Sequence, residues 1–234
     1  MTQPAIDAVH HVAPSREARR ILLVMLPGYG MERDDFARHG FVDAVHERGW
    51  PVDIIAVRPD VGLYLDGTVA ERLHEDIVLS ARSAPSALWF LGVSLGAMGA
   101  LLYARRYPRH VAGVILLAPF LGSPGLIAEV AEAGGLAHWD PGDVRPADLE
   151  RQLLSWLKAR PPTAQDALAL YLGYGRGDRF ARGAAVLAQE LPAPRVMVTD
   201  GGHDWETWKR LWQHVLDCSP FQTATGQPNA ETGG

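Results

Sequence analysis

Six short apolar runs recur along the chain, and longer segments with apolar residues at every third or fourth position separate them. Each run is apolar almost throughout, which is typical of strands that are covered on both faces. The predicted strands are residues 21–26, 52–57, 87–92, 111–118, 167–173 and 195–199. Strand–helix alternation of this kind predicts an α/β fold, with a mostly parallel, doubly wound sheet and helices on both faces.

Helical spacing is clearest in three of the connecting segments, Val69–Ser80, Leu95–Tyr107 and Arg179–Leu191. A strand before the first strong run is only weakly indicated, around Ala8–Val12. Ligands of such sheets bind outside the carboxyl ends of the strands. The residues that directly follow each strand are therefore the first place to look for a site.

One connection, about residues 122–165, is too long for a simple crossover. Ser123–Pro124 favours the start of a helix that ends at Gly134–Gly135. Pro146 can start a second helix, which Pro161–Pro162 ends. We predict a small helical insertion over the sheet edge. Two interpretations remain open, a lid over the substrate site and a structural elaboration with no part in binding.

The length of 234 residues suits one well-buried domain and is short for two. We assign residues 1–218 to a single domain. The remaining segment, 219–234, is polar and rich in Gly, Pro and Thr, so we expect it to be disordered.

Charge and composition narrow the class of partner. A net charge of −5 without a dense basic patch argues against nucleic acid. No apolar run approaches the ~20 residues of a membrane span, and no secretory signal is evident. Cys218 is the only cysteine, which excludes an internal disulfide and a thiol zinc cluster. We expect a cytoplasmic monomer or homodimer that acts on a small molecule without metal or cofactor.

One serine stands between two glycines at a predicted strand–helix junction. The stretch Gly92-Val93-Ser94-Leu95-Gly96 matches G-x-S-x-G, a weak motif alone but a stronger one between a strand and a helix. A turn this sharp strains the central residue and needs neighbours without side chains. It would present the Ser94 hydroxyl at a helix N-terminus, where developing negative charge is favoured. The alternative interpretation is an ordinary tight turn in which Ser94 has no catalytic role.

A serine nucleophile needs a base, and the base needs an acid. His203 follows two glycines directly after the last predicted strand, and only His138 in the insertion is a rival. Asp178 lies in a glycine-rich loop after the strand at 167–173 and is favoured as the acid. Asp200 and Asp204 are very close to the histidine in sequence. Asp178 could instead cap the following helix, or do both if its two oxygens were divided between the roles.

An oxyanion intermediate needs hydrogen-bond donors aimed at it, each worth roughly 10²–10³ in rate. The backbone N–H of Leu95, next to the serine, is one candidate. The loop Leu26-Pro27-Gly28-Tyr29-Gly30 follows the first strong strand and offers the N–H of Tyr29 as the second.

The order Ser94, Asp178, His203 with an oxyanion loop upstream resembles the α/β-hydrolase superfamily, over roughly Ile21 to Val215. The stretch GGHDWETW looks like the histidine loop of the putative-esterase branch, which includes esterase D and enterochelin-esterase-like enzymes. This resemblance implies a two-step acyl transfer in which Ser94 attacks, His203 shuttles the proton and water releases the acyl group. Many relatives carry His-Gly where this chain has Pro27-Gly28.

The walls of the substrate pocket are less well marked. The expected lining residues are Leu63, Tyr64, His138, Trp139, Trp156 and Trp205. A mostly apolar wall without a basic cluster favours a neutral ester over a phosphorylated or polyanionic substrate. The same aromatic residues could equally belong to the core.

The sequence therefore predicts a carboxylesterase-type serine hydrolase acting on small carboxylic esters. A thioesterase or acyltransferase could use the same triad, because the residues do not distinguish an oxygen ester from a thioester. A non-catalytic ligand-binding protein of the same fold is the alternative from another class.

Overall fold

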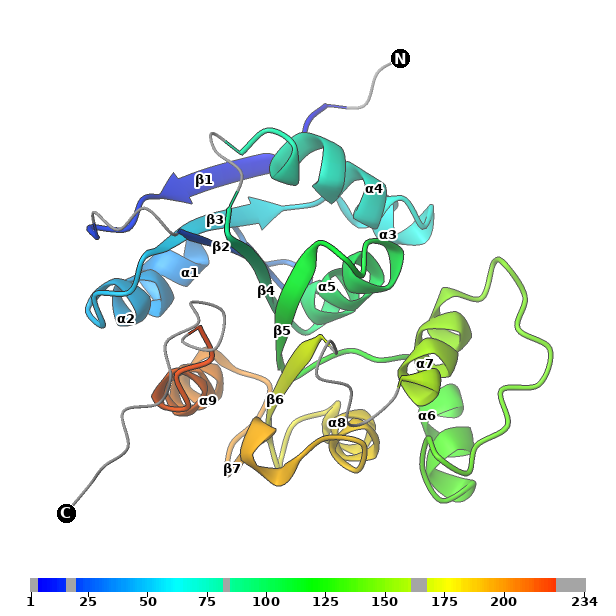
Figure 1. The fold of residues 1–234 in the computed structure, drawn as a ribbon. Helices are drawn as coiled ribbons and strands as arrows, with labels where there is room; N and C mark the ends of the chain where they lie inside the picture. Colours follow the sequence, from blue (N-terminus) through cyan, green and yellow to red (C-terminus); the bar gives the residue numbers. More distant parts are fainter. Residues whose placement is uncertain (1–3, 16–19, 82–84, 161–167, 222–234) are drawn as a thin grey trace.

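The computed structural model describes residues 4–15, 20–81, 85–160 and 168–221. A seven-stranded sheet crosses this part of the chain in the order β1-β3-β2-β4-β5-β6-β7 (Figure 1). The strands are β1 (Asp7–His11), β2 (Ile21–Leu26), β3 (Val52–Arg58), β4 (Ala87–Val93), β5 (Val111–Leu117), β6 (Ala169–Gly175) and β7 (Val196–Thr199). All neighbouring strands are parallel except β1, which pairs antiparallel with β3 at one edge.

The helices lie in two layers, one on each face of the sheet (Figure 1). One layer holds α1 (Asp35–Arg38), α2 (Phe41–His46) and α9 (Trp205–Asp217). The other holds α3 (Val61–Leu65), α4 (Val69–Leu73) with the π-helical turn η1 (His74–Val78), α5 (Leu95–Arg106), α6 (Pro124–Glu132), α7 (Leu149–Ala159) and α8 (Ala181–Ala188). A short 3₁₀ turn, η2 (Ala193–Arg195), precedes β7.

Residues that alternate along the strands supply the two cores. In β2, Leu23 and Met25 pack toward α1, α2 and α9, whereas Val24 and Leu26 pack toward α5 and its neighbours. All six residues of β2 are buried because both faces are covered. This confirms the predicted α/β architecture with helices on both faces. The weakly indicated N-terminal strand is present as β1.

Several boundaries differ from the sequence expectation. Strand β6 begins at Ala169 and ends at Gly175, two residues later than predicted. The second helix of the insertion begins at Leu149 instead of Pro146, because the Asp148 side chain accepts the backbone N–H of Arg151 as its cap.

The folded part also extends past residue 218. Phe221 is buried, with its ring packed edge-on against Trp50 and Trp89. The buried core therefore includes Phe221, three residues beyond the expected domain boundary at 218. Residues 222–234 lie outside the described part of the chain.

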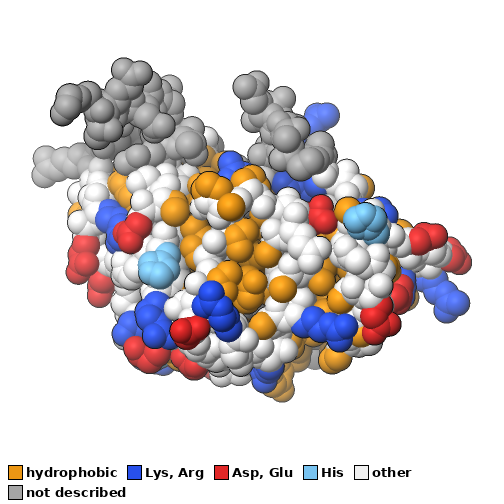
Figure 2. All heavy atoms as spheres, turned by 90° about the horizontal axis from the view of Figure 1, so that it is seen from below, with side chains coloured by type: hydrophobic (Ala, Val, Ile, Leu, Met, Phe, Trp, Pro, Cys, Tyr) orange, Lys and Arg blue, Asp and Glu red, His pale blue; other side chains and the backbone are white. Residues whose placement is uncertain are grey.

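The insertion packs on the same layer as α5 and α8. Helix α7 contacts α5, and α6 contacts α8, so that Leu126, Val130 and Leu153 belong to the core on that side of the sheet. On the face shown in Figure 2, acidic and basic side chains are interspersed around apolar positions, and neither sign of charge dominates that face.

Candidate active site

Ser94 occupies the turn that joins β4 to α5. Its φ is 55°, in the region that non-glycine residues seldom adopt and that often marks a functional site. The Ser94 N–H donates to the carbonyl of Leu117 at 3.0 Å, and the Ser94 carbonyl accepts the N–H of Phe120 at 3.0 Å. Two hydrogen bonds to the end of β5 thus hold the strained residue in place.

The two glycines of the motif make this turn sterically possible. A Cβ on Gly92 would lie 2.4 Å from the Cα of Ala97, and a Cβ on Gly96 would lie 2.2 Å from the carbonyl oxygen of Leu26. Strand, helix and the neighbouring strand β2 therefore approach more closely than any side chain allows. This close approach is the one that the sequence predicted for the glycines.

The structure brings Ser94, His203 and Asp178 together from the ends of three strands. Nε2 of His203 lies 3.1 Å from Oγ of Ser94, and Nδ1 of His203 lies 2.8 Å from Oδ2 of Asp178. Ser94 and the Asp178 side chain are buried, and the His203 side chain is mostly buried. The three side chains form one continuous hydrogen-bonded chain.

The second oxygen of Asp178 has its own partner. Oδ1 accepts the backbone N–H of Phe180 at 2.7 Å, while Oδ2 faces His203. Helix α8 begins at Ala181, two residues later than predicted, so Asp178 braces the loop before the helix. The two oxygens are thus divided between His203 and the loop, whereas the expected helix cap is absent, because the N-cap of α8 is Phe180 and no side chain caps it.

The two rival carboxylates are engaged elsewhere. The Asp200 side chain is 93% exposed and pairs with Arg176. Asp204 caps α9, where hydrogen bonds from the backbone N–H and side chain of Thr207 outweigh burial and lower the pKa of Asp204. Neither is bonded to His203.

Aromatic rings flank His203 on two sides. Phe180 and Trp208 meet the imidazole edge-to-face, with centroids 5.1 and 5.0 Å away. Trp205 lies beyond Trp208, half-buried and stacked on His39 at 4.1 Å. The Trp205 ring belongs to the aromatic cluster around α1 and α2.

The expected oxyanion donors lie beside Ser94. Leu95 is the first residue of α5, and Tyr29 lies in a turn closed by the hydrogen bond from Met31 N–H to the Gly28 carbonyl at 3.2 Å. In the described part of the chain, no acceptor is bound to the N–H of Tyr29 or Leu95. Both amides are thus available to a ligand.

A cavity of about 270 Å³ opens next to these amides. Its wall includes Tyr29, Met31, Val61, Tyr64 and Leu95. Burial raises the pKa of the Tyr64 phenol, which therefore stays neutral. Tyr64 thus lines a cavity together with Tyr29 and Leu95, and its contact with substrate stays a prediction.

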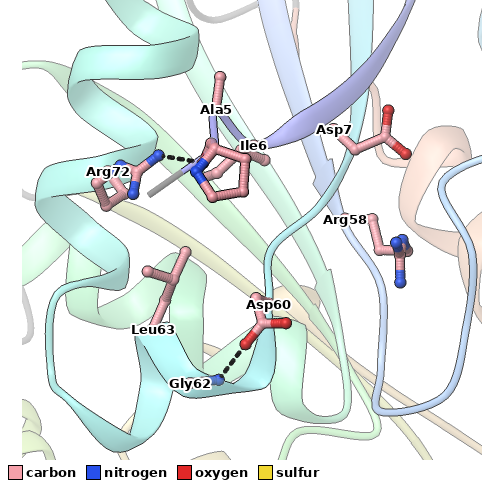
Figure 3. A pocket seen from close by; sticks show the side chains of 9 residues that line it. Ala5, Ile6, Asp7, Arg58, Asp60, Gly62, Leu63 and Arg72 are labelled. Carbon is pink, nitrogen blue, oxygen red and sulfur yellow. Dashed lines mark hydrogen bonds between the residues drawn. The ribbon is translucent and has the colours of Figure 1, made fainter. Parts of the chain in front are cut away.

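A larger cavity of about 450 Å³ lies next to the first, between the N-terminal segment and helices α3 and α4 (Figure 3). Arg58 and Asp60 line both cavities, and Leu63 lines the larger one. Figure 3 shows Asp60 turned toward the N–H of Gly62, whose hydrogen bond it accepts at 2.7 Å.

The aromatic residues of the insertion line neither cavity. His138 is exposed, and Trp139 is buried with its indole N–H donated to Glu129 at 2.7 Å. Arg151 packs over the Trp139 ring and forms two hydrogen bonds with the same glutamate. Trp156 is half-buried with Arg160 over its ring. The Trp139 side chain is thus a core residue of the insertion.

Among the described residues, no three His, Cys, Asp or Glu side chains gather so that they could hold a metal ion. No helix in that part of the chain is long and apolar enough to cross a membrane.

A comparison with family models adds to this geometry. The model described as "Putative esterase" matches residues 4–216, which is nearly the whole chain. The chain belongs to the Putative esterase family. It is accordingly a carboxylesterase-type enzyme. No curated protein matches the sequence.

Solved structures of other members of this fold share its architecture. Est1E from Butyrivibrio proteoclasticus has a TM-score of 0.63 at 14% identity, covering 95% of each chain. MGS-MChE2, an α/β-hydrolase enzyme from the metagenome of lagoon sediments, has a TM-score of 0.59 at 17% identity, covering 96% of this chain and 98% of its own. Enterochelin esterase from Shigella flexneri has a TM-score of 0.62 at 15% identity, covering 94% of this chain and 55% of its own. The Putative esterase chain therefore has the α/β-hydrolase fold.

Proposed function

We propose that this Putative esterase chain hydrolyses small carboxylic esters through an acyl-enzyme on Ser94. The observation that carries the proposal is the unbroken hydrogen-bonded chain from Ser94 Oγ through His203 to Asp178. A neutral hydroxyl is a poor nucleophile, and a base at hydrogen-bond distance removes this barrier.

In the first step, Ser94 Oγ attacks the ester carbonyl while Nε2 of His203 takes the hydroxyl proton. The backbone N–H groups of Tyr29 and Leu95 stabilise the oxyanion of the tetrahedral intermediate. Its collapse breaks the ester C–O bond, and His203 returns the proton to the leaving alcohol. Asp178 holds the imidazole in the tautomer that leaves Nε2 free to accept, and it stabilises the imidazolium.

In the second step, water attacks the acyl-enzyme and gives its proton to His203. The second oxyanion collapses, and Ser94 leaves with that proton, so the enzyme is restored. The products are one carboxylic acid and one alcohol for each ester and water consumed.

The cavity beside the oxyanion amides supports a small substrate group. Its volume is about 270 Å³. Its wall combines apolar side chains, among them Met31 and Val61, with the charged side chains Glu32, Arg58 and Asp60. We therefore expect an ester small enough to fit this cavity.

Labelling with a fluorophosphonate probe tests the nucleophile. Wild-type protein is expected to be labelled, and Ser94→Ala is expected to take no label while remaining folded by circular dichroism. Absence of labelling in folded wild-type protein contradicts the proposal. A chain-length panel of matched oxygen and thiol esters, with alcohol acceptors added, then separates esterase from thioesterase and acyltransferase.

A further inference from the structure

One methionine side chain closes the turn that carries Tyr29. The N–H of Gly28 donates to Sδ of Met31 at 3.1 Å, in addition to the backbone hydrogen bond from Met31 N–H back to Gly28. A thioether is a weak acceptor. Here it nevertheless binds the first amide of the turn, so that Met31 holds Gly28 through both its backbone and its side chain.

The same sulfur packs the turn against the serine. A Cβ on Gly28 would lie 3.0 Å from Sδ of Met31 and 3.1 Å from Cβ of Ser94. The sulfur and Ser94 therefore both crowd the one position where a side chain of Gly28 would lie, which brings Met31, Gly28 and Ser94 close together. The Met31 sulfur is thus positioned to influence how closely the turn approaches Ser94.

Tyr29 receives no comparable support from its own side chain, which is 79% exposed. The position of its N–H therefore depends on the backbone of the turn alone. Because the sulfur of Met31 engages the N–H of Gly28, the N–H of Tyr29 is the next amide that can reach a ligand.

We propose that Met31 is a positioning residue for the oxyanion hole. Its sulfur fixes the Gly28–Met31 turn so that the N–H of Tyr29 points at the developing oxyanion. This inference rests on the proposed function, because it gives Met31 a role only if Ser94 forms a tetrahedral intermediate. Although Met31 does not touch the reacting atoms in this proposal, its loss should lower the rate clearly, since misplacing a reacting group by about 1 Å can cost 10²-fold in rate.

The test replaces the Met31 sulfur while keeping the volume of the side chain nearly the same. Met31→Leu removes the acceptor, and swaps that conserve side-chain volume are the ones a folded protein tolerates best. Met98→Leu is the matched control, because Met98 is a buried methionine of α5 that does not touch the turn through any hydrogen bond. Both variants are assayed with 4-nitrophenyl butyrate and with a trifluoromethyl ketone inhibitor, which forms a hemiketal oxyanion with an active serine.

Met31→Leu is expected to lower kcat about tenfold and to weaken the ketone about tenfold, with KM within about twofold of wild type. Met98→Leu is expected to leave all three values within about twofold. Met31→Gln keeps an acceptor at similar reach and is expected to recover most of kcat. A KM effect alone would indicate that Met31 only lines the pocket.

Three further outcomes also overturn the inference. Equal kinetics for Met31→Leu and Met98→Leu remove any special role for the sulfur. An equal loss in Met31→Leu and Met31→Gln shows that the acceptor is not what matters. If folded wild-type protein is neither labelled at Ser94 nor active on the ester, the proposed function itself has failed, and this inference fails with it.

Discussion

Oδ2 of Asp178 lies 2.8 Å from Nδ1 of His203, and the other oxygen of the same carboxylate accepts the backbone N–H of Phe180. The carboxylate is thus fixed in orientation by the chain that follows it. Each oxygen has one partner, so a change at either oxygen bears on the imidazole.

Asp178→Asn is expected to lower kcat by about a thousandfold or more. The amide would keep an oxygen for the Phe180 N–H and turn its NH₂ toward His203, which forces the proton onto Nε2 and leaves no base beside Ser94. Steady-state kinetics with circular dichroism measure the effect. Asp200→Asn is the control, because the Asp200 side chain is exposed, is paired with Arg176 and is not bonded to His203, so its kcat should stay within about twofold. A nearly active Asp178→Asn would remove Asp178 from the triad.

Gly96→Ala is expected to destabilise the fold by about 3 kcal/mol or more, because its Cβ would lie 2.2 Å from the backbone carbonyl oxygen of Leu26. Gly125→Ala provides the contrast. Its Cβ would meet nothing within 4 Å in α6, so this change should stabilise by about 0.5–1 kcal/mol. Urea unfolding of both variants gives the comparison, and equal stabilities would contradict the packing argument.

The insertion should contribute less stability in acid. Hydrogen bonds from Arg151 and then Trp139 lower the pKa of Glu129 from 4.5 to about 2. Because this folded-state pKa lies below the ordinary value, the contribution is fully present above about pH 4.5 and is lost as the pH falls toward about 2. Its size is modest because Glu129 is partly exposed.

The measurement is the urea midpoint of wild type and Glu129→Gln at pH values from 7 to 3. The wild type should have the higher midpoint at pH 7, and the difference should shrink below pH 4.5. A difference that is constant with pH would show that the ion pair is not its source.

Trp139→Phe is expected to lower stability by about 1–3 kcal/mol without changing KM by more than about twofold. The change removes the indole N–H that Glu129 accepts and leaves a gap in a buried position. Unfolding and ester kinetics on the same preparation give both values. An increased KM at unchanged stability would instead place Trp139 at the substrate, as the sequence suggested.

The nucleophile turn could be predicted because its signal is local. Gly92, Ser94 and Gly96 lie within five residues, and their steric demands follow from one turn. Asp178 and His203 were found by a topological argument, since the carboxyl ends of parallel strands share one edge of the sheet. The argument for Asp178 and His203 needs only the positions of the strands.

The pocket and the turn support could not be predicted in the same way. The sequence marks Trp139 as apolar and helix-adjacent, but only the packing of α6 and α7 shows that its indole meets Glu129. Met31 carries no motif at all. Its proposed role follows from the hydrogen bond between the Gly28 N–H and the Met31 sulfur. The pattern of apolar residues along the sequence does not predict such a contact.

Ser94 and His203 are 109 residues apart in sequence, and they follow the fourth and the last strand of the sheet. During synthesis at about 5–20 residues per second, the histidine is made roughly 5 to 20 seconds after the serine. A nascent chain therefore carries the serine for that time without the base that would activate it. Under the proposed mechanism, ester cleavage therefore requires that β7 and the loop carrying His203 have joined the sheet.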